Sequence, residues 1–137
     1  MIAYNQMIDL TSGIVDWKLF GAWLDTEGSV SSIFAKNRKI NNRILYKREH
    51  ELAIYQADKT ALEVLRDFLL EAGVSATYMY RNRKTGVWSL KLMRIRDIEL
   101  AVSNVEPYLI TENKKWQIER FKRFRSERYH RIGEVAA

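Results

Sequence analysis

The chain contains no cysteine, one proline and two histidines among its 137 residues. The lack of cysteine excludes disulfide bonds and thiolate metal sites. No run of about 18 apolar residues occurs, so no membrane-spanning helix and no membrane partner are expected. The N-terminus also lacks the basic and apolar regions of a signal peptide. We therefore expect an intracellular protein.

Several signatures of catalytic chemistry are missing as well. The sequence has no Ser-His-Asp order and no nucleophile elbow, which disfavours a serine hydrolase. It has no glycine-rich loop of the kind that cradles phosphates. His50 and His130 have no partner at metal-ligand spacing, so we expect no zinc site and interpret both as surface or strand residues.

The chain is basic, with a formal net charge of +6, and it is 47% hydrophobic and 12% aromatic. Its length and apolar content fit one domain over residues 1–137, with a core at about residues 12–131. Nineteen of the 23 basic residues fall within residues 27–50, 78–94 and 112–131. Basic clusters interleaved with aromatic residues favour nucleic acid as a partner; the alternative is a basic surface that binds nothing.

One segment combines a helical pattern with two unusual features. The helical face consists of Leu10, Ile14, Trp17, Gly21 and Leu24. This spacing predicts a helix over residues 12–25, capped by Ser12 or Asp16 and ended by Gly28 as a C-terminal glycine.

The first unusual feature is the small pair Gly21-Ala22, which suits the close approach of two backbones. The second is the pair of acids Asp25 and Glu27, which lie at the negative end of the helix macrodipole. A divalent cation at that end would make their charge favourable.

The remaining elements complete the order αββαββα. Residues 29–38 and 44–56 read as two strands around Asn41-Asn42, and residues 76–83 and 87–94 as a second hairpin around residues 84–86. A helix follows the predicted N-cap Asp58 and ends at Gly73. A short helix over residues 97–105 and a long basic helix over residues 113–131 follow, and the last residues look frayed. Two hairpins, each followed by a helix, predict an α+β fold with a four-stranded antiparallel sheet and its helices on one face.

The opposite face of this sheet is expected to be basic. Alternation in the second hairpin predicts that Arg81, Arg83 and Lys91 share a face, and further basic residues gather toward the turn of the first hairpin. A twisted basic two-stranded ribbon fits the major groove of DNA, although each position could also be an ordinary solvent-facing one. The predicted DNA contacts are Lys36, Arg38, Arg43, Lys47, Tyr55, Arg81, Arg83, Ser89 and Lys91.

Residues 20–28, Phe-Gly-Ala-Trp-Leu-Asp-Thr-Glu-Gly, resemble the LAGLIDADG motif of homing endonucleases, with Asp25 and Glu27 at its two acids. The order of elements is similar to that family over about residues 12–122. Asp58, at a strand-to-helix junction, falls where the family positions an active-site water. Arg81-Asn82-Arg83 looks like its basic pair on a DNA-contacting strand. Residues 107–115 resemble the segment that supplies an active-site lysine, here Lys114 or Lys115.

The resemblance implies a Mg²⁺-dependent endonuclease for double-stranded DNA. Mn²⁺ could substitute, and Ca²⁺ is expected to bind without supporting cleavage. Glu27 and the backbone carbonyl of Thr26 would ligate the metal, and the catalytic residues would be Glu27, Lys114 or Lys115, and Asp58. Asp25 would either join them or support the helix end.

One motif per chain implies a homodimer, which would read a pseudo-palindromic target and pack through Phe20, Gly21, Ala22 and Leu24. The length of the chain points to an intron-encoded origin. Two alternatives stay open, namely an RNA maturase that assists splicing of a group I intron, and a DNA-binding regulator that has lost cleavage.

Overall fold

The computed structural model describes residues 15–125 and 129–134, without the side chains of residues 34–38, 40, 45 and 129–134. Leu10, Ser12 and Ile14 of the predicted helix therefore lie outside the described residues. The helices and strands are α2 (Trp17–Glu27), β1 (Gly28–Ile40), β2 (Arg43–Gln56), α3 (Lys59–Glu71), β3 (Tyr78–Arg81), β4 (Trp88–Leu92), α4 (Ile95–Val105), the 3-10 helix η2 (Glu106–Tyr108), α5 (Glu112–Phe124) and β5 (Tyr129–Glu134). Through α5 this is the predicted αββαββα order.

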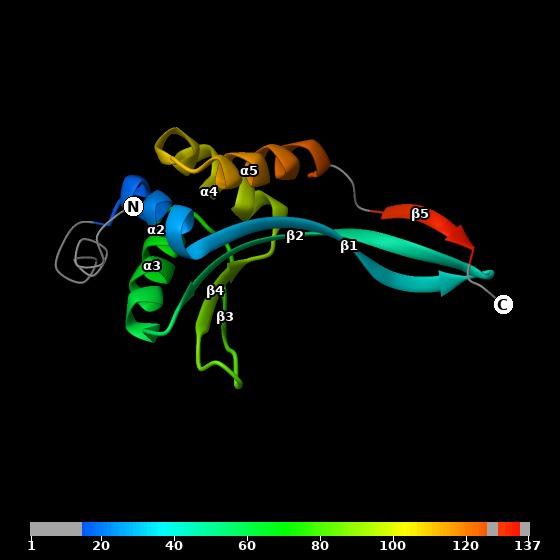
Figure 1. The fold of residues 1–137 in the computed structure, drawn as a ribbon, viewed down its shortest axis with the longest axis horizontal. Helices are drawn as coiled ribbons and strands as arrows, with labels where there is room; N and C mark the ends of the chain where they lie inside the picture. Colours follow the sequence, from blue (N-terminus) through cyan, green and yellow to red (C-terminus); the bar gives the residue numbers. More distant parts are fainter. Residues whose placement is uncertain (1–14, 126–128, 135–137) are drawn as a thin grey trace.

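Four strands of the five-stranded antiparallel sheet follow the predicted arrangement, in the order β1-β2-β4-β3, and the fifth, β5, pairs with β2. Figure 1 shows β1 and β2 as a long curved hairpin that extends well beyond the helices. Its turn is Asn41-Asn42, and both residues have positive φ angles, 47° and 60°. Two consecutive positive φ angles are what a two-residue hairpin turn requires, and asparagine tolerates them.

The helices cover one face of this sheet, as predicted. The buried strand residues on that face include Val30, Leu52, Ile54, Leu90 and Leu92. Their register places them together, because Leu52 pairs with Leu92 and Ile54 with Leu90. Against them pack fully buried side chains of α2, α3, α4 and α5, namely Phe20, Trp23, Leu24, Leu62, Leu65, Leu69, Ile98, Ile118 and Phe121.

The C-terminal part differs from the prediction of one helix over residues 113–131. Helix α5 ends at Phe124, and β5 pairs with β2 from Arg43 to Lys47. Strand β4 pairs with β2 only from Leu52 to Gln56, so the outer part of the same edge of β2 is open to another strand. Strand β5 forms backbone hydrogen bonds along this edge, although the sequence suggested that the last residues are frayed.

Gly28 has a different role from the predicted C-terminal glycine. Its φ of −127° is extended, and it begins β1 directly at the end of α2. A Cβ atom at this position would lie 2.8 Å from the carbonyl oxygen of Ala53 and 2.8 Å from a methyl carbon of Leu24. Glycine is therefore required by the close approach of β2, and a left-handed conformation plays no part.

Gly28→Ala is expected to lower the free energy of unfolding by about 1–3 kcal/mol, because the backbone carbonyl of Ala53 must move to admit the methyl group. Urea denaturation measures the difference. Ser29→Ala, at the next residue, is the matched control and is expected to change stability by no more than about 0.5 kcal/mol. Equal stabilities of the two variants would contradict the steric explanation.

Candidate active site and nucleic-acid interface

Helix α2 presents Glu27 at its exposed C-terminal end. Asp16 caps the start of the helix by accepting a hydrogen bond from the Leu19 amide at 2.8 Å, which confirms one of the two predicted caps. Thr26 and Glu27 are both exposed, and the chain continues directly into β1. The Thr26 hydroxyl donates to the carbonyl of Ala22 at 2.9 Å. The Glu27 carboxylate therefore lies at the surface where a helix end meets the sheet.

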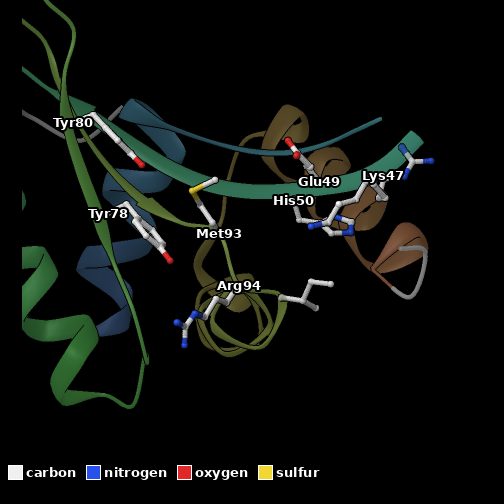
Figure 2. Close-up of a pocket in the computed structure, with 9 residues that line it drawn as sticks. Lys47, Glu49, His50, Tyr78, Tyr80, Met93 and Arg94 are labelled. Carbon is white, nitrogen blue, oxygen red and sulfur yellow. The ribbon is translucent and has the colours of Figure 1, made fainter. Parts of the chain in front are cut away.

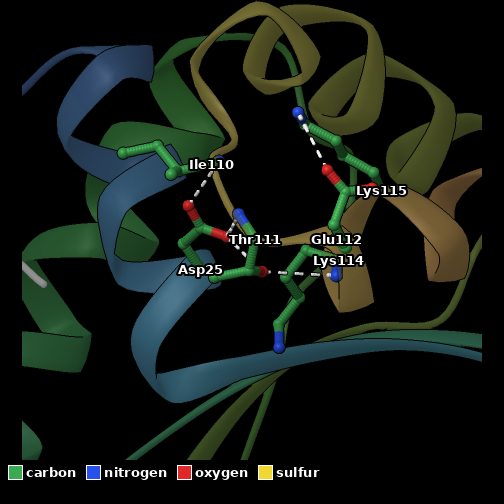
Figure 3. Close-up of polar contacts among 6 residues, drawn as sticks. All are labelled: Asp25, Ile110, Thr111, Glu112, Lys114 and Lys115. Atoms are coloured by element: carbon green, nitrogen blue, oxygen red, sulfur yellow. Dashed lines mark hydrogen bonds and ion pairs between the residues drawn. The ribbon is translucent and has the colours of Figure 1, made fainter.

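Asp25, in contrast, is buried and fully engaged. Its carboxylate accepts hydrogen bonds from the Ile110 amide at 2.7 Å, the Thr111 hydroxyl at 2.7 Å and the Thr111 amide at 3.2 Å (Figure 3). Thr111 is the N-cap of α5, so this carboxylate lies at the positive end of a second helix. That field offsets the unfavourable position at the C-terminus of α2. These hydrogen bonds give Asp25 a supporting role at the end of α2, and a part for it in metal binding stays a prediction.

The same junction separates Lys114 from Lys115. Lys114 is buried at 8% exposure. Its side chain extends from α5 toward the start of β1 (Figure 3). Lys115 is half exposed and lies 3.8 Å from Glu112 on the outside of the helix. Gln117 accepts a hydrogen bond from the Val30 amide at 2.7 Å and so fixes α5 against β1. Lys114 is thus the lysine that faces the end of α2.

Asp58 occupies the predicted junction between β2 and α3. Its carboxylate accepts a hydrogen bond from the Thr60 amide at 2.9 Å, which is the N-cap interaction expected from the sequence. A role in positioning water at this residue stays a prediction.

The face of the sheet opposite the helices is open. Strand pairing puts Tyr55 beside Ser89, Ser89 beside Tyr80, and Lys91 between Ala53 and Tyr78. Tyr55 and Tyr80 are 40% and 50% exposed, while Ser89 is buried between them. Together with Arg81 they line a hollow of about 430 Å³. The open face therefore has a floor of small residues with aromatic and charged side chains standing above it.

The predicted basic face needs two corrections. Arg81 pairs with Trp88 and Lys91 with Tyr78, so their positions alternate to opposite faces of the hairpin. The Arg81 side chain, at the end of β3, nevertheless lines the same hollow as Lys91. Strand β3 ends at Arg81, and Arg83 lies in the turn, where Asn82 accepts hydrogen bonds from the Lys84 and Thr85 amides. The strand is shorter than the alternation suggested because this turn begins early.

The outer half of the first hairpin also contains a register irregularity. Lys36 pairs with Tyr46, whereas Arg38 pairs with Leu45, with a shift between them. The side chains of Lys36 and Arg38 lie outside the described part, so their DNA contacts stay predictions. Lys47 is exposed and Arg43 partly exposed on β2.

A groove of about 610 Å³ lies beside the middle of β2, where β4 no longer pairs with it. Figure 2 shows Tyr78 and Tyr80 on one side of this groove, and Lys47, Glu49 and His50 on the other. His50 is buried beneath α5, with its Nδ1 atom 2.7 Å from the Ser32 hydroxyl and its ring edge-on to Phe121. The histidine is thus a buried strand residue packed in the core.

The predicted dimer contacts on α2 divide between two faces of the helix. Phe20 and Leu24 are completely buried in their own chain, so neither can face a second copy. A Cβ at Gly21 would lie 3.6 Å from that of Val105 and 3.5 Å from that of Tyr108, so its close neighbours are α4 and η2 of the same chain. Ala22 is also buried, but it keeps 8% of its surface exposed. The apolar stripe that we predicted for the dimer is therefore largely the stripe that builds the monomer core.

Sequence reasoning missed Thr111, Gln117 and Glu51. Thr111 could have been found as a polar residue just before the start of the basic helix, the position of an N-cap. Gln117 carries no such signal, because its partner in β1 is 87 residues away. Lys47, Glu49 and Glu51 follow one another at every second position of β2. This period of two places all three side chains on the same face of the strand, the open one.

Neither a family model nor a curated protein sequence matches the chain. Solved structures do. The homing endonuclease I-TnaI superposes with a TM-score of 0.64 at 18% identity, over 82% of this chain and 72% of that one. The meganuclease I-SmaMI bound to uncleavable DNA gives 0.65 at 18% identity, over 80% and 36%. The archaeal intron-encoded homing endonuclease I-Vdi141I, complexed with DNA, gives 0.61 at 14% identity, over 79% and 65%.

The chain has the fold of the LAGLIDADG homing endonucleases, which confirms the fold that the motif implied. It spans 72% of I-TnaI and 65% of I-Vdi141I, but only 36% of I-SmaMI.

Within the described ranges, no helix has the length and apolar character needed to cross a bilayer. The same ranges hold no group of three or more His, Cys, Asp or Glu side chains placed to bind a metal ion.

Asp25→Asn is expected to lower the free energy of unfolding by about 1.5–3 kcal/mol. The asparagine side chain has one acceptor oxygen, whereas the two carboxylate oxygens of Asp25 together accept three hydrogen bonds. Glu27→Gln, two residues away and exposed, should change the free energy of unfolding by no more than about 0.5 kcal/mol. Urea denaturation without metal or DNA measures both. Small and equal effects would mean that Asp25 does not hold the two helices together.

Proposed function

We propose that the protein is a site-specific endonuclease that cuts double-stranded DNA as a homodimer. The observation that carries the proposal is the junction of α2, β1 and α5 at the edge of the open sheet face. The hydrogen bonds from Thr111 to Asp25 fix this junction. We assign Glu27, two residues after Asp25, and Lys114, three residues after Thr111, to one site. The likeness to homing endonucleases solved with DNA supports the proposal.

The donors at the end of α2 fit a hard divalent cation. Glu27 offers an exposed carboxylate, and Thr26 offers a backbone carbonyl in the last turn, where helix carbonyls point beyond the helix end. Mg²⁺ prefers such oxygen ligands, and when bound it would activate a water molecule and neutralise charge on the leaving oxygen. Mn²⁺ and Ca²⁺ bind the same type of donor, and one of the similar structures, I-CvuI, was solved with its target in the presence of Ca²⁺.

Lys114 supplies a fixed positive charge to this site. Burial of its aliphatic stem against β1 restricts the side chain, so the ammonium group is held in place before a phosphate arrives. A fixed cation stabilises developing negative charge more effectively than a mobile one, because it does not reorganise during the reaction. Lys115, paired on the outer surface with Glu112, is not placed for this role.

A second copy is needed because each chain offers one exposed carboxylate of this kind and a double-strand cut requires two sites. The residues of α2 that we assign to this contact are Leu19, Ala22 and Thr26, at spacings of three and four residues. Leu19 is partly buried and Thr26 is exposed. Ala22 and Thr26 are small enough to let two helices approach closely. I-SmaMI, of which this chain matches 36%, is more than twice as long and has room for a second such unit in one chain.

The two alternative functions, an RNA maturase and a DNA-binding regulator without cleavage, would use the same open face of the sheet. Incubation of the full chain and Mg²⁺ with randomised DNA duplexes, and separately with group I intron RNA, distinguishes them. Cleaved duplexes support the endonuclease, stimulated splicing supports the maturase, and duplex binding without a cut supports a regulator.

Glu27→Gln is expected to abolish double-strand cleavage while leaving DNA affinity within about threefold, because it removes a metal-binding charge from an exposed position. Cleavage and binding are measured on a duplex recovered by selection from a randomised library. Glu63→Gln, on α3, is the matched control and should cut normally. Retained cleavage by Glu27→Gln would refute the assigned site.

Ala22→Phe is expected to convert the dimer to a monomer and to lower cleavage at least tenfold, because the ring holds the two α2 helices apart. Size-exclusion chromatography with light scattering measures the mass, and circular dichroism checks folding. Ala72→Phe, at an exposed position after α3, is the control and should remain dimeric. A dimeric Ala22→Phe protein would place the contact elsewhere.

A further inference from the structure

An oppositely charged pair stands in the middle of the open sheet face. The Lys91 ammonium lies 3.0 Å from a carboxylate oxygen of Glu51, and the two side chains are 24% and 27% exposed. Lys91 lies beside Ala53 in the register, and Glu51 comes two residues before Ala53 on the same face of β2. The pair is thus held at a fixed place on two neighbouring strands.

The surroundings restrict this pair further. The Lys91 ammonium is 5.4 Å from the centre of the Tyr80 ring, which attracts it from the other side. Ala53 is fully buried and Ser89 is 7% exposed, so small side chains that do not cover the pair lie beside it on the two strands. The small Ser31 faces Glu51 from β1. Glu51 and Lys91 are therefore partly exposed above small neighbours on this face, where a ligand that enters between the flanking tyrosines can reach them.

A carboxylate is unexpected on a face that meets a polyanion, because it repels phosphate oxygens. It is useful, however, if it meets base edges. In the major groove, lysine donates to the O6 and N7 acceptors of guanine, and glutamate accepts from the N4 amino group of cytosine. These acceptors and this donor lie next to one another on a single G·C pair.

We infer that Glu51 and Lys91 together read one G·C base pair in each half of the target, with lysine on guanine and glutamate on cytosine. Three protons on the ammonium allow one bond to Glu51 and two to guanine. An A·T pair keeps the N7 acceptor but replaces O6 by an amino group, so the lysine loses one of its two bonds, and it presents a carbonyl oxygen to the glutamate, which is repulsive. The inference rests on the proposed DNA-binding function and assigns specificity to one position of the site.

The charge-swapped variant Glu51→Lys/Lys91→Glu tests it directly. Full-length protein in Ca²⁺ buffer selects binding sites from a randomised duplex library. The wild-type protein is expected to enrich G·C at one position per half-site, and the swapped protein C·G at that same position, with the other positions unchanged. The single variants Lys91→Met and Glu51→Gln should each lose about tenfold or more in preference at that position alone.

A matched control swaps the Lys122–Glu106 ion pair, which joins α5 to η2 on the helix side with Nζ–O distances of 2.7 and 2.5 Å. Its selected site should equal that of the wild type. Identical motifs from the Glu51/Lys91 swap and the wild type would overturn the inference while leaving the endonuclease in place. A uniform loss of affinity in Lys91→Met, with a salt dependence lower by one charge, would assign Lys91 to a phosphate and overturn it too. A wild-type protein that selects no motif would overturn both proposals.

Discussion

The Asp25 carboxylate is the contact on which the site depends. It lies at the end of one helix and the beginning of another, and three hydrogen bonds from Ile110 and Thr111 hold it there. Residues far apart in the chain are joined within a few ångströms by this one group. The position of Glu27, two residues farther on, and of Lys114, three residues after Thr111, follows from it. A charged acceptor suits this place because the start of α5 provides backbone donors and a positive dipole end.

Helix α2 uses its faces for different neighbours. One face, with Phe20 and Leu24, is completely buried in the core of its own chain. Gly21 lets α4 and η2 approach, and Gly28 lets β2 approach at the point where the helix becomes a strand. The face with Ala22 and Thr26 is the one proposed to meet a second copy. Small residues in this helix therefore serve two close approaches inside the chain as well as the proposed one between chains.

The sheet separates the core from the open face by simple alternation. Leu52 and Ile54 point to the helices, while Glu51, Ala53 and Tyr55 belong to the open face. The open face is mixed in charge, since Lys91 is paired with Glu51. In the proposed DNA complex, general attraction for the phosphates would come from basic residues farther out, such as Lys47. A paired donor and acceptor near the middle suits a base pair better than a phosphate.

The sequence by itself determined the order of elements, the Asn41-Asn42 turn, the caps Asp16 and Asp58 and the alternation of the long strands, because each of these depends on neighbours within a few residues. It also located the acidic helix end. The tertiary structure decided what local patterns cannot encode: that Asp25 binds backbone donors of residues 110 and 111, that Lys114 and not Lys115 turns inward, and that residues 129–134 add to the edge of β2. Each of these depends on contacts between segments distant in the chain, whose geometry exists only once the helices have packed on the sheet.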